Sequence, residues 1–280
     1  MSFLFYFLNV ASSVGQSALS KQYAVKHGNA TVFNINKALA GSAAFLFLGV
    51  LTGMSFHVPT LLFGIGYGIV LCFSMHFGFR ALSTGPMALT SIIASFSLVI
   101  PFVFGIAVWK EPISVCGRIG IVCLLIAILL FNAKKEKNNI SLKWFIYAIL
   151  TLLTNGICSL IQKYHQLYFP KLYRMEFMLF SLCCVLLILT VQQTAAHGRN
   201  RPSFHFSTQG MVAGVLNSTA NYSVLYLSAT EKASVLFPVI SVVNVIGAWF
   251  IGMVVFKERL TFLQICGLVT GITAVLLLNI

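Results

Sequence analysis

Amide and imidazole side chains stand inside apolar stretches that are long enough to be membrane spans. Asn217 and Asn221 lie one helical turn apart and share a helix face. At an offset of 145 residues His76 aligns with Asn221, and Cys72 aligns with Asn217. Polar groups are costly in lipid, so such side chains are expected to line a cavity that binds a solute. The alternative is hydrogen bonding between helices, which Asn and His also perform.

Single polar side chains in other spans are further candidates for binding, and the four selected are Gln16, Ser91, Asn155 and Asn244. Gln16 shares a helix face with Ser13 and Ser20 through i, i+3 and i+7 spacing. A lone serine in a membrane helix more often satisfies backbone or packing needs, and this alternative stands for Ser91. Together with His76, Asn217 and Asn221, these residues form the predicted substrate-binding set.

Carboxylates are expected at helix ends only. Glu111 and Glu258 precede apolar spans, where a negative charge favours the positive N-terminal end of a helix. We therefore interpret both as structural residues. No carboxylate falls in the middle of a span, whereas proton-coupled cation carriers usually use one. A neutral or zwitterionic solute fits this pattern better, with His76 as the one group that could couple a proton near neutral pH.

Composition excludes most soluble classes of protein. The chain is 59% hydrophobic and 8% charged, with a mean hydropathy of +0.94. A soluble domain carries roughly 25% charged residues, so the solvent of this chain is expected to be lipid. The net charge of +13 is spread over helix ends, which disfavours nucleic acid. The seven cysteines have no metal-type spacing, and we expect no metal, no cofactor and no enzyme activity.

Ten apolar spans account for almost the whole chain, since each needs about 20 residues. They are expected at residues 3–24, 31–52, 61–82, 86–108, 112–132, 142–164, 174–193, 208–228, 234–256 and 261–279. The run Gly64, Gly66 and Gly68 lacks the strand–turn–helix setting of a dinucleotide loop. We therefore expect close backbone packing there.

The chain repeats itself. At an offset of 147 residues Lys110 aligns with Lys257, Glu111 with Glu258, and nearby glycines also align. This predicts a first repeat at 1–133, a basic connector at 134–141 and a second repeat at 142–280. Five spans per repeat is an odd number, so the second copy must enter the membrane from the opposite side. The predicted fold is an all-α membrane protein of two inverted five-helix repeats, with a site near the midplane.

The doubled pattern resembles the EamA-type, ten-helix branch of the drug/metabolite transporter superfamily. The resemblance rests on Trp109-Lys110-Glu111-Pro112-Ile113 and on Phe256-Lys257-Glu258-Arg259-Leu260, each before a glycine-containing span. It covers essentially the whole chain and implies a membrane carrier of metabolites, often an exporter. It also implies that both termini lie in the cytoplasm.

The distribution of basic residues predicts the opposite membrane orientation to the one that the resemblance implies. Twelve of them, Lys37 included, fall on the side of the loop that joins the first two spans, and six fall on the opposite side. The positive-inside rule would put the twelve-charge side in the cytoplasm and both termini outside. Both orientations remain open.

The expected function is secondary transport of a small polar or amphipathic metabolite, as an exporter or exchanger that works by alternating access. A lipid or lipid-precursor flippase is the alternative, and an intramembrane enzyme is a weaker one, because His76 with Cys72 lacks an orienting acid. We expect a multi-pass protein of the plasma membrane, in a bacterium the inner membrane. The partners are a small-molecule substrate and the bilayer, without nucleic acid, and a monomer and a homodimer both remain open.

Overall fold

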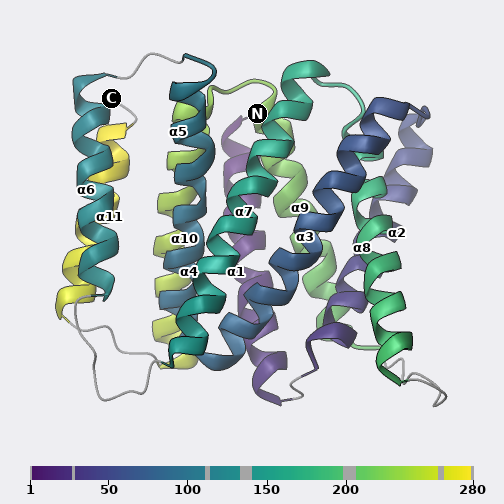
Figure 1. The fold of residues 1–280 in the computed structure, drawn as a ribbon, viewed down its shortest axis with the longest axis horizontal. Coiled ribbons are helices and arrows are strands. Elements are labelled where there is room, and N and C mark those ends of the chain that lie inside the picture. Colours follow the sequence, from purple (N-terminus) through teal and green to yellow (C-terminus); the bar gives the residue numbers. More distant parts are fainter. Residues whose placement is uncertain are drawn as a thin grey trace.

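The computed structural model describes residues 2–26, 29–110, 114–132, 141–197, 206–257 and 262–278. These residues form α-helices and one short 3₁₀ helix, without a β-strand among them (Figure 1). The elements are α1 (Ser2–Lys26), α2 (Ala30–Thr52), α3 (Val58–Thr84), α4 (Met87–Ser95), η1 (Phe96–Leu98), α5 (Val99–Ala107), α6 (Val115–Asn132), α7 (Leu142–Tyr168), α8 (Arg174–His197), α9 (Thr208–Ser228), α10 (Ala233–Phe256) and α11 (Phe262–Leu278).

The helix bounds lie within about one turn of those expected from the sequence, with one break in the fourth expected span. That span was expected to be continuous over 86–108, but η1 separates α4 from α5. Pro101 explains the break, because its ring clashes with the carbonyl of Ser97 and it donates no hydrogen bond. The helix tightens into a 3₁₀ turn over the residues just before this proline.

The end of α7 also differs from expectation. A loop was expected from His165, whereas the helix continues to Tyr168, so His165 and Gln166 are helical. Phe169 then leaves the helical region (φ −127°, ψ 70°) because it precedes Pro170.

Side-chain caps fix the start of four helices. At α6, Ser114 Oγ accepts from the Gly117 amide at 3.0 Å. Asn29 Oδ1 accepts a hydrogen bond from the Val32 amide (3.2 Å). Ser141 and Ser207 accept in the same way at the start of α7 and α9, each at 3.2 Å. Each cap satisfies one of the backbone donors that a helix N-terminus leaves open.

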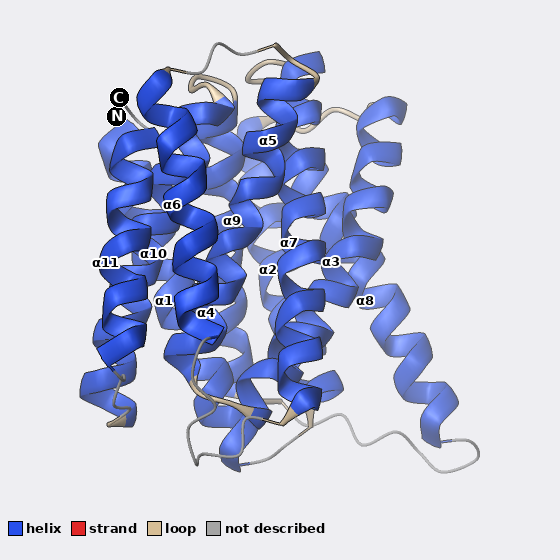
Figure 2. Ribbon diagram, turned by 60° about the vertical axis from the view of Figure 1, so that its left-hand side comes forward, coloured by secondary structure: helices blue, strands red, loops and turns tan. Residues whose placement is uncertain are grey.

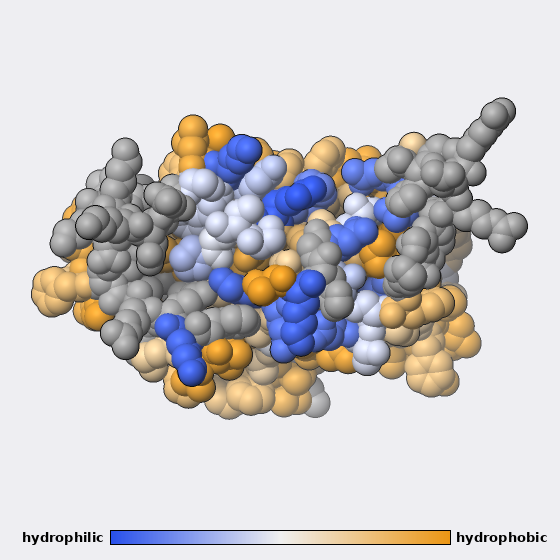
Figure 3. Space-filling model, turned by 90° about the horizontal axis from the view of Figure 1, so that it is seen from below, coloured by the Kyte–Doolittle hydropathy of each residue, from blue (hydrophilic) through white to orange (hydrophobic). Residues whose placement is uncertain are grey.

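The outer surface is apolar. Five stretches of helix are long and apolar enough to cross a bilayer: Ala30–Thr52, Val58–Thr84, Leu89–Ala107, Leu142–Tyr168 and Arg174–Ala195. Large side chains such as Phe47 (67% exposed) and Leu187 (65% exposed) point outward from them. Figure 3 shows one end of the molecule, where hydrophilic residues gather centrally and hydrophobic residues lie along the edges. These features indicate a membrane protein.

Helices from the two ends of the sequence pack against each other. α1 lies against α9, α3 against α7 and α8, and α2 against α8 and α9. α4 packs on α10 and α7, α1 also touches α10, and α6 pairs with α11. Figures 1 and 2 place the start of α1 and the end of α11 at the same end of the molecule.

Two glycine pairs permit the closest of these approaches. A Cβ added to Gly64 would meet Phe180 Cβ at 2.8 Å, and one added to Gly68 would meet Ser181 O at 2.6 Å, both on α8. On α9, Gly210 and Gly214 lie equally close to α2. Close backbone packing is therefore confirmed for Gly64 and Gly68. It is wrong for Gly66, which has open space beside it.

Candidate binding cavity

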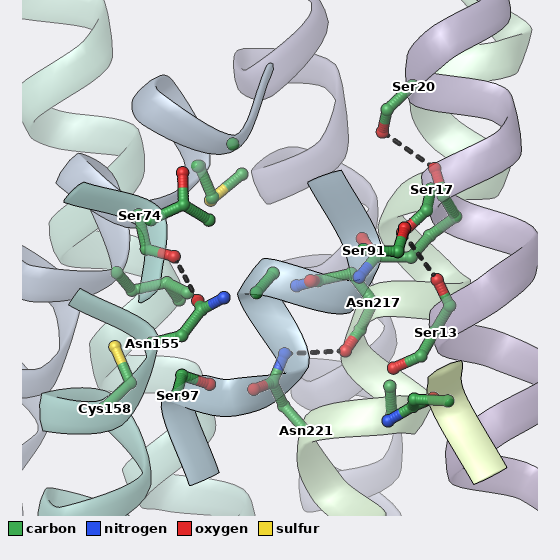
Figure 4. A pocket seen from close by; sticks show the side chains of 18 of the residues that line it. Ser13, Ser17, Ser20, Ser74, Ser91, Ser97, Asn155, Cys158, Asn217 and Asn221 are labelled. Carbon is green, nitrogen blue, oxygen red and sulfur yellow. Dashed lines mark hydrogen bonds between the residues drawn. The ribbon is translucent and has the colours of Figure 1, made fainter. Parts of the chain in front are cut away.

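A cavity of about 240 Å³ lies inside the helix assembly. Its lining comes from α1, α2, α3, α4, η1, α7, α9 and α10, which belong to both halves of the sequence (Figure 4). Hydroxyl and amide groups make up much of the lining, although the outside of the molecule is apolar. A polar interior behind an apolar exterior favours a polar ligand, because polar groups inside a membrane protein require hydrogen-bonding partners.

Six of the seven predicted binding residues line this cavity, namely Gln16, Ser91, Asn155, Asn217, Asn221 and Asn244. His76 is not among the lining residues. On α3 the lining positions include Tyr67, Leu71, Met75 and Leu82, which follow the helical period. His76 lies one position beyond that stripe, and its ring packs edge-on against Phe77 with centroids 5.9 Å apart. Cys72, its aligned neighbour, is buried in a hydrophobic cluster.

Three polar side chains form a network across α3, α7 and α9. The Tyr67 hydroxyl donates to Asn221 Oδ1 at 2.8 Å and accepts from Gln162 Nε2 at 2.9 Å. Gln162 Nε2 also lies 3.4 Å from Asn221 Oδ1. Asn221 Nδ2 in turn donates to the Asn217 carbonyl at 2.8 Å. Asn221 therefore both lines the cavity and links helices.

A second contact joins α3 to α7, where the Ser74 hydroxyl donates to Asn155 Oδ1 (Figure 4).

The serines of α1 donate within their own helix instead of to a neighbouring helix. Ser17 donates to the Ser13 carbonyl at 2.9 Å, and Ser20 to the Gln16 carbonyl at 2.7 Å. These hydroxyl protons satisfy their own helix, which leaves hydroxyl oxygens as acceptors toward the cavity.

Several buried amide atoms of the lining have no hydrogen-bond partner. They are Asn9 Oδ1, Gln16 Oε1, Asn34 Nδ2 and Asn244 Oδ1. Buried polar atoms are nearly always hydrogen-bonded, so each exception asks for an explanation. A ligand or water in the cavity would supply the missing partners.

Lys37 and Asn34 line the cavity but are absent from the substrate-binding set predicted from the sequence, which considered Lys37 only as a basic residue that a lipid flippase would use. The basic side chain of Lys37 was expected on the loop side of the molecule, but it lines the cavity from α2 and is only 8% exposed. It lies about 10 Å along α2 from Ala30. One signal could have identified it, because Lys37 is the only charged residue within α2.

A polar layer closes the end of the assembly where α3 begins and α7 ends. Thr60 Oγ1 lies 3.3 Å from His165 Nε2, and Gln166 Oε1 accepts from Arg174 Nε at 3.0 Å. Lys163 Nζ donates to the carbonyls of Ser228 (3.0 Å) and Glu231 (2.8 Å). These contacts tie α7 to the start of α3, to α8 and to the α9–α10 turn.

Glu111 and Glu258 lie outside the described residues, so their expected role is not visible. The residue before each is described. Lys110 (φ 53°) and Lys257 (φ 54°) both adopt the left-handed conformation. That conformation is uncommon outside glycine, and it recurs at the two positions that the sequence repeat aligns.

No family model matches the chain, and no curated protein matches it. Solved structures do match. One protein known from a crystal structure superposes with a TM-score of 0.71 at 13% identity, over 99% of this chain and 95% of the other. At that identity the similarity establishes a shared fold across the whole chain.

Proposed function

We propose that this protein is a secondary transporter that moves a small polar or amphipathic metabolite across a membrane by alternating access. The polar cavity, lined by helices whose outer faces are apolar, is the observation that carries the proposal. We place the protein in the plasma membrane, in a bacterium the inner membrane, with export or exchange as its direction. In this proposal it binds and releases its substrate unchanged.

The packing of the helices supports two inverted five-span halves. We match α1, α2, α3, α4–α5 and α6 with α7, α8, α9, α10 and α11 in that order. The α1–α9 contact then corresponds to α7–α3, and α2–α9 corresponds to α8–α3. The pairs α2–α8, α4–α10 and α6–α11 correspond to themselves. A twofold axis in the membrane plane would produce this set, as in inverted-repeat transporters.

Local features recur with the same pairing. The Gly64 and Gly68 pair on α3 faces α8, and the Gly210 and Gly214 pair on α9 faces α2, at an offset of 146 residues. The left-handed lysines at 110 and 257 add a second coincidence. We take these as support for membership in the drug/metabolite transporter superfamily, EamA-type branch, which the sequence pattern resembles.

The transport proposal is tested first by screening for ligands and then by measuring the transport of those ligands. A metabolite panel is screened for compounds that raise the melting temperature of the purified protein, since a ligand of the folded state stabilises it. Compounds that bind are then measured by counterflow in proteoliposomes. We expect Gln16→Met to reduce the counterflow rate about tenfold, which corresponds to ~1.4 kcal/mol. Stability should be unchanged, because Gln16 Oε1 has no internal partner to lose.

Gln22→Met is the matched control, since Gln22 lies on the same helix but is exposed and outside the cavity lining. Its counterflow should equal that of the wild type. Flux no greater than in protein-free liposomes for every bound compound would refute the transport proposal. Equal counterflow rates in Gln16→Met and Gln22→Met would show that Gln16 does not bind the substrate.

A further inference from the structure

Lys37 places a positive charge in the cavity, and no described carboxylate lies beside it. Its side chain is 8% exposed and lines the cavity. No hydrogen-bond acceptor or carboxylate in the described part of the chain pairs with it. A buried ammonium group is stable only when paired or hydrogen-bonded, so its partner is expected to come from a bound molecule.

The two described acids, Glu176 and Glu231, do not supply that partner. The chain contains five glutamates and no aspartate. Of the described glutamates, Glu176 accepts from the Ser55 amide at 3.0 Å, beyond the far end of α2. Glu231 lies in the turn between α9 and α10, at the end of the molecule opposite to the start of α2. Neither of these acids lines the cavity.

Asn34 provides a second, independent donor beside Lys37. Its side chain is 2% exposed, it lines the cavity, and its Nδ2 atom has no acceptor. The two residues are three positions apart on α2 and therefore share a face. Two hydrogen-bond donors that have no acceptor among the described residues lie on one face, and one of them is charged. Together they form a site for an anionic oxygen group.

We propose that Lys37 and Asn34 bind the anionic end of the transported molecule, a carboxylate or a phosphate monoester, so that the substrate is a small organic anion. This inference rests on the proposed function. The unpartnered oxygens of Asn9, Gln16 and Asn244 would accept hydrogen bonds from hydroxyl or amino groups elsewhere on that molecule. The absence of membrane-embedded acids had favoured a neutral or zwitterionic solute, but the buried lysine favours an anion.

The proposal requires the ligand to carry a negative charge. This is tested by comparing how tightly the full-length protein binds each anion and its uncharged analogue. The probes are benzoate with benzamide, succinate with succinamide, benzyl phosphate with benzyl alcohol, and the acids of a metabolite panel with their amides. We expect at least one anion to bind the wild type tenfold or more tightly than its uncharged partner. Lys37→Gln should reduce that preference to less than twofold.

Two variants control for charge and for folding. Lys26→Gln removes the same charge from the exposed end of α1, and it should keep the full preference. Asn34→Asp places a carboxylate one turn before Lys37, where it can pair with the ammonium group. It should also abolish the preference, and it keeps Lys37 in place if Lys37→Gln fails to fold.

The outcomes separate the two proposals. Failure of every anion to outbind its uncharged partner would overturn the anion site, as would an unchanged preference in Lys37→Gln or Asn34→Asp. Stabilisation by phosphatidylglycerol in nanodiscs but by no soluble anion would also overturn it, in favour of a lipid headgroup. If anions bind through Lys37 yet none crosses in counterflow, the site stands and the transport proposal fails.

Discussion

At the scale of single residues, Tyr67 connects three helices through one hydroxyl group. The side chain is completely buried, and its hydroxyl bonds Asn221 of α9 and Gln162 of α7. Removing this hydroxyl would take away both bonds and leave Gln162 Nε2 and Asn221 Oδ1 only their longer contact of 3.4 Å. The network therefore holds the cavity lining from both halves in one arrangement.

Tyr67→Phe should lower the free energy of unfolding by about 1 kcal/mol, because hydrogen bonds in membrane proteins contribute ~0.6 kcal/mol each on average. Unfolding by steric trapping in bicelles measures it. Tyr222→Phe is the control, since the Tyr222 hydroxyl has no hydrogen bond within the described residues. Equal losses in the two variants would mean that the network adds no stability.

Most of the amide residues of the lining could be predicted from the sequence, because an amide within an apolar span has few other uses. Gln16, Asn155 and Asn244 were selected on that ground and line the cavity. Asn9, Asn34 and Gln162 were not selected. His76 was selected by alignment with Asn221, and a shift of one residue on a helix turns a side chain by roughly 100°. Lys37 was counted with the basic residues of the loop side, and its place in the cavity follows from the tertiary packing of α2.

At the scale of elements, glycine spacing decides how closely helices cross. α3 and α8 approach through Gly64 and Gly68, whereas Gly66 faces open space. The sequence predicted close packing for the run as a whole. Which of the three glycines takes part depends on the side of α3 that meets α8, and that follows from tertiary contacts.

Gly68→Ala and Gly66→Ala form a matched pair on one helix. A Cβ at Gly68 would lie 2.6 Å from Ser181 O and 2.8 Å from Cys184 Cβ, so the helices must move apart. We expect a loss of about 1–3 kcal/mol in unfolding free energy, the usual cost of overpacking. Gly66→Ala should be neutral or stabilising by up to ~1 kcal/mol through helix propensity. Comparable loss in both variants would contradict the close crossing.

Helix existence and most helix ends followed from apolar run length. The caps at Asn29, Ser141 and Ser207 were first seen in the structure. The 3₁₀ break at Phe96–Leu98 was not expected either, although Pro101 was visible. Pro238 is equally visible in α10 and leaves that helix continuous. It stands near the start of α10, which runs from Ala233 to Phe256. Position within the helix, not the proline alone, decides the outcome.

At the scale of the whole molecule, the halves of the sequence are interleaved. α1 packs mainly on α9, α2 on α8 and α9, and α3 on α7 and α8. A half taken alone would keep few of these contacts. The cavity lining likewise combines α1–α4 with α7, α9 and α10.

Separate expression of residues 1–137 and 138–280 tests this interdependence. We expect the two fragments to copurify when they are produced together, and to retain ligand stabilisation. Each fragment produced alone should be recovered poorly and give no cooperative thermal transition. A fragment that accumulates alone to the level of the intact protein would show that the halves fold independently.

The interleaved packing has a consequence for biogenesis. α1 and α2 leave the ribosome well before α9, and at ~5–20 residues per second the delay is roughly 10–35 s. During that interval Asn9, Gln16, Asn34 and Lys37 are in the bilayer without the helices that later surround them. The nascent chain therefore needs the translocon or an insertase to shelter these side chains until the last helices arrive.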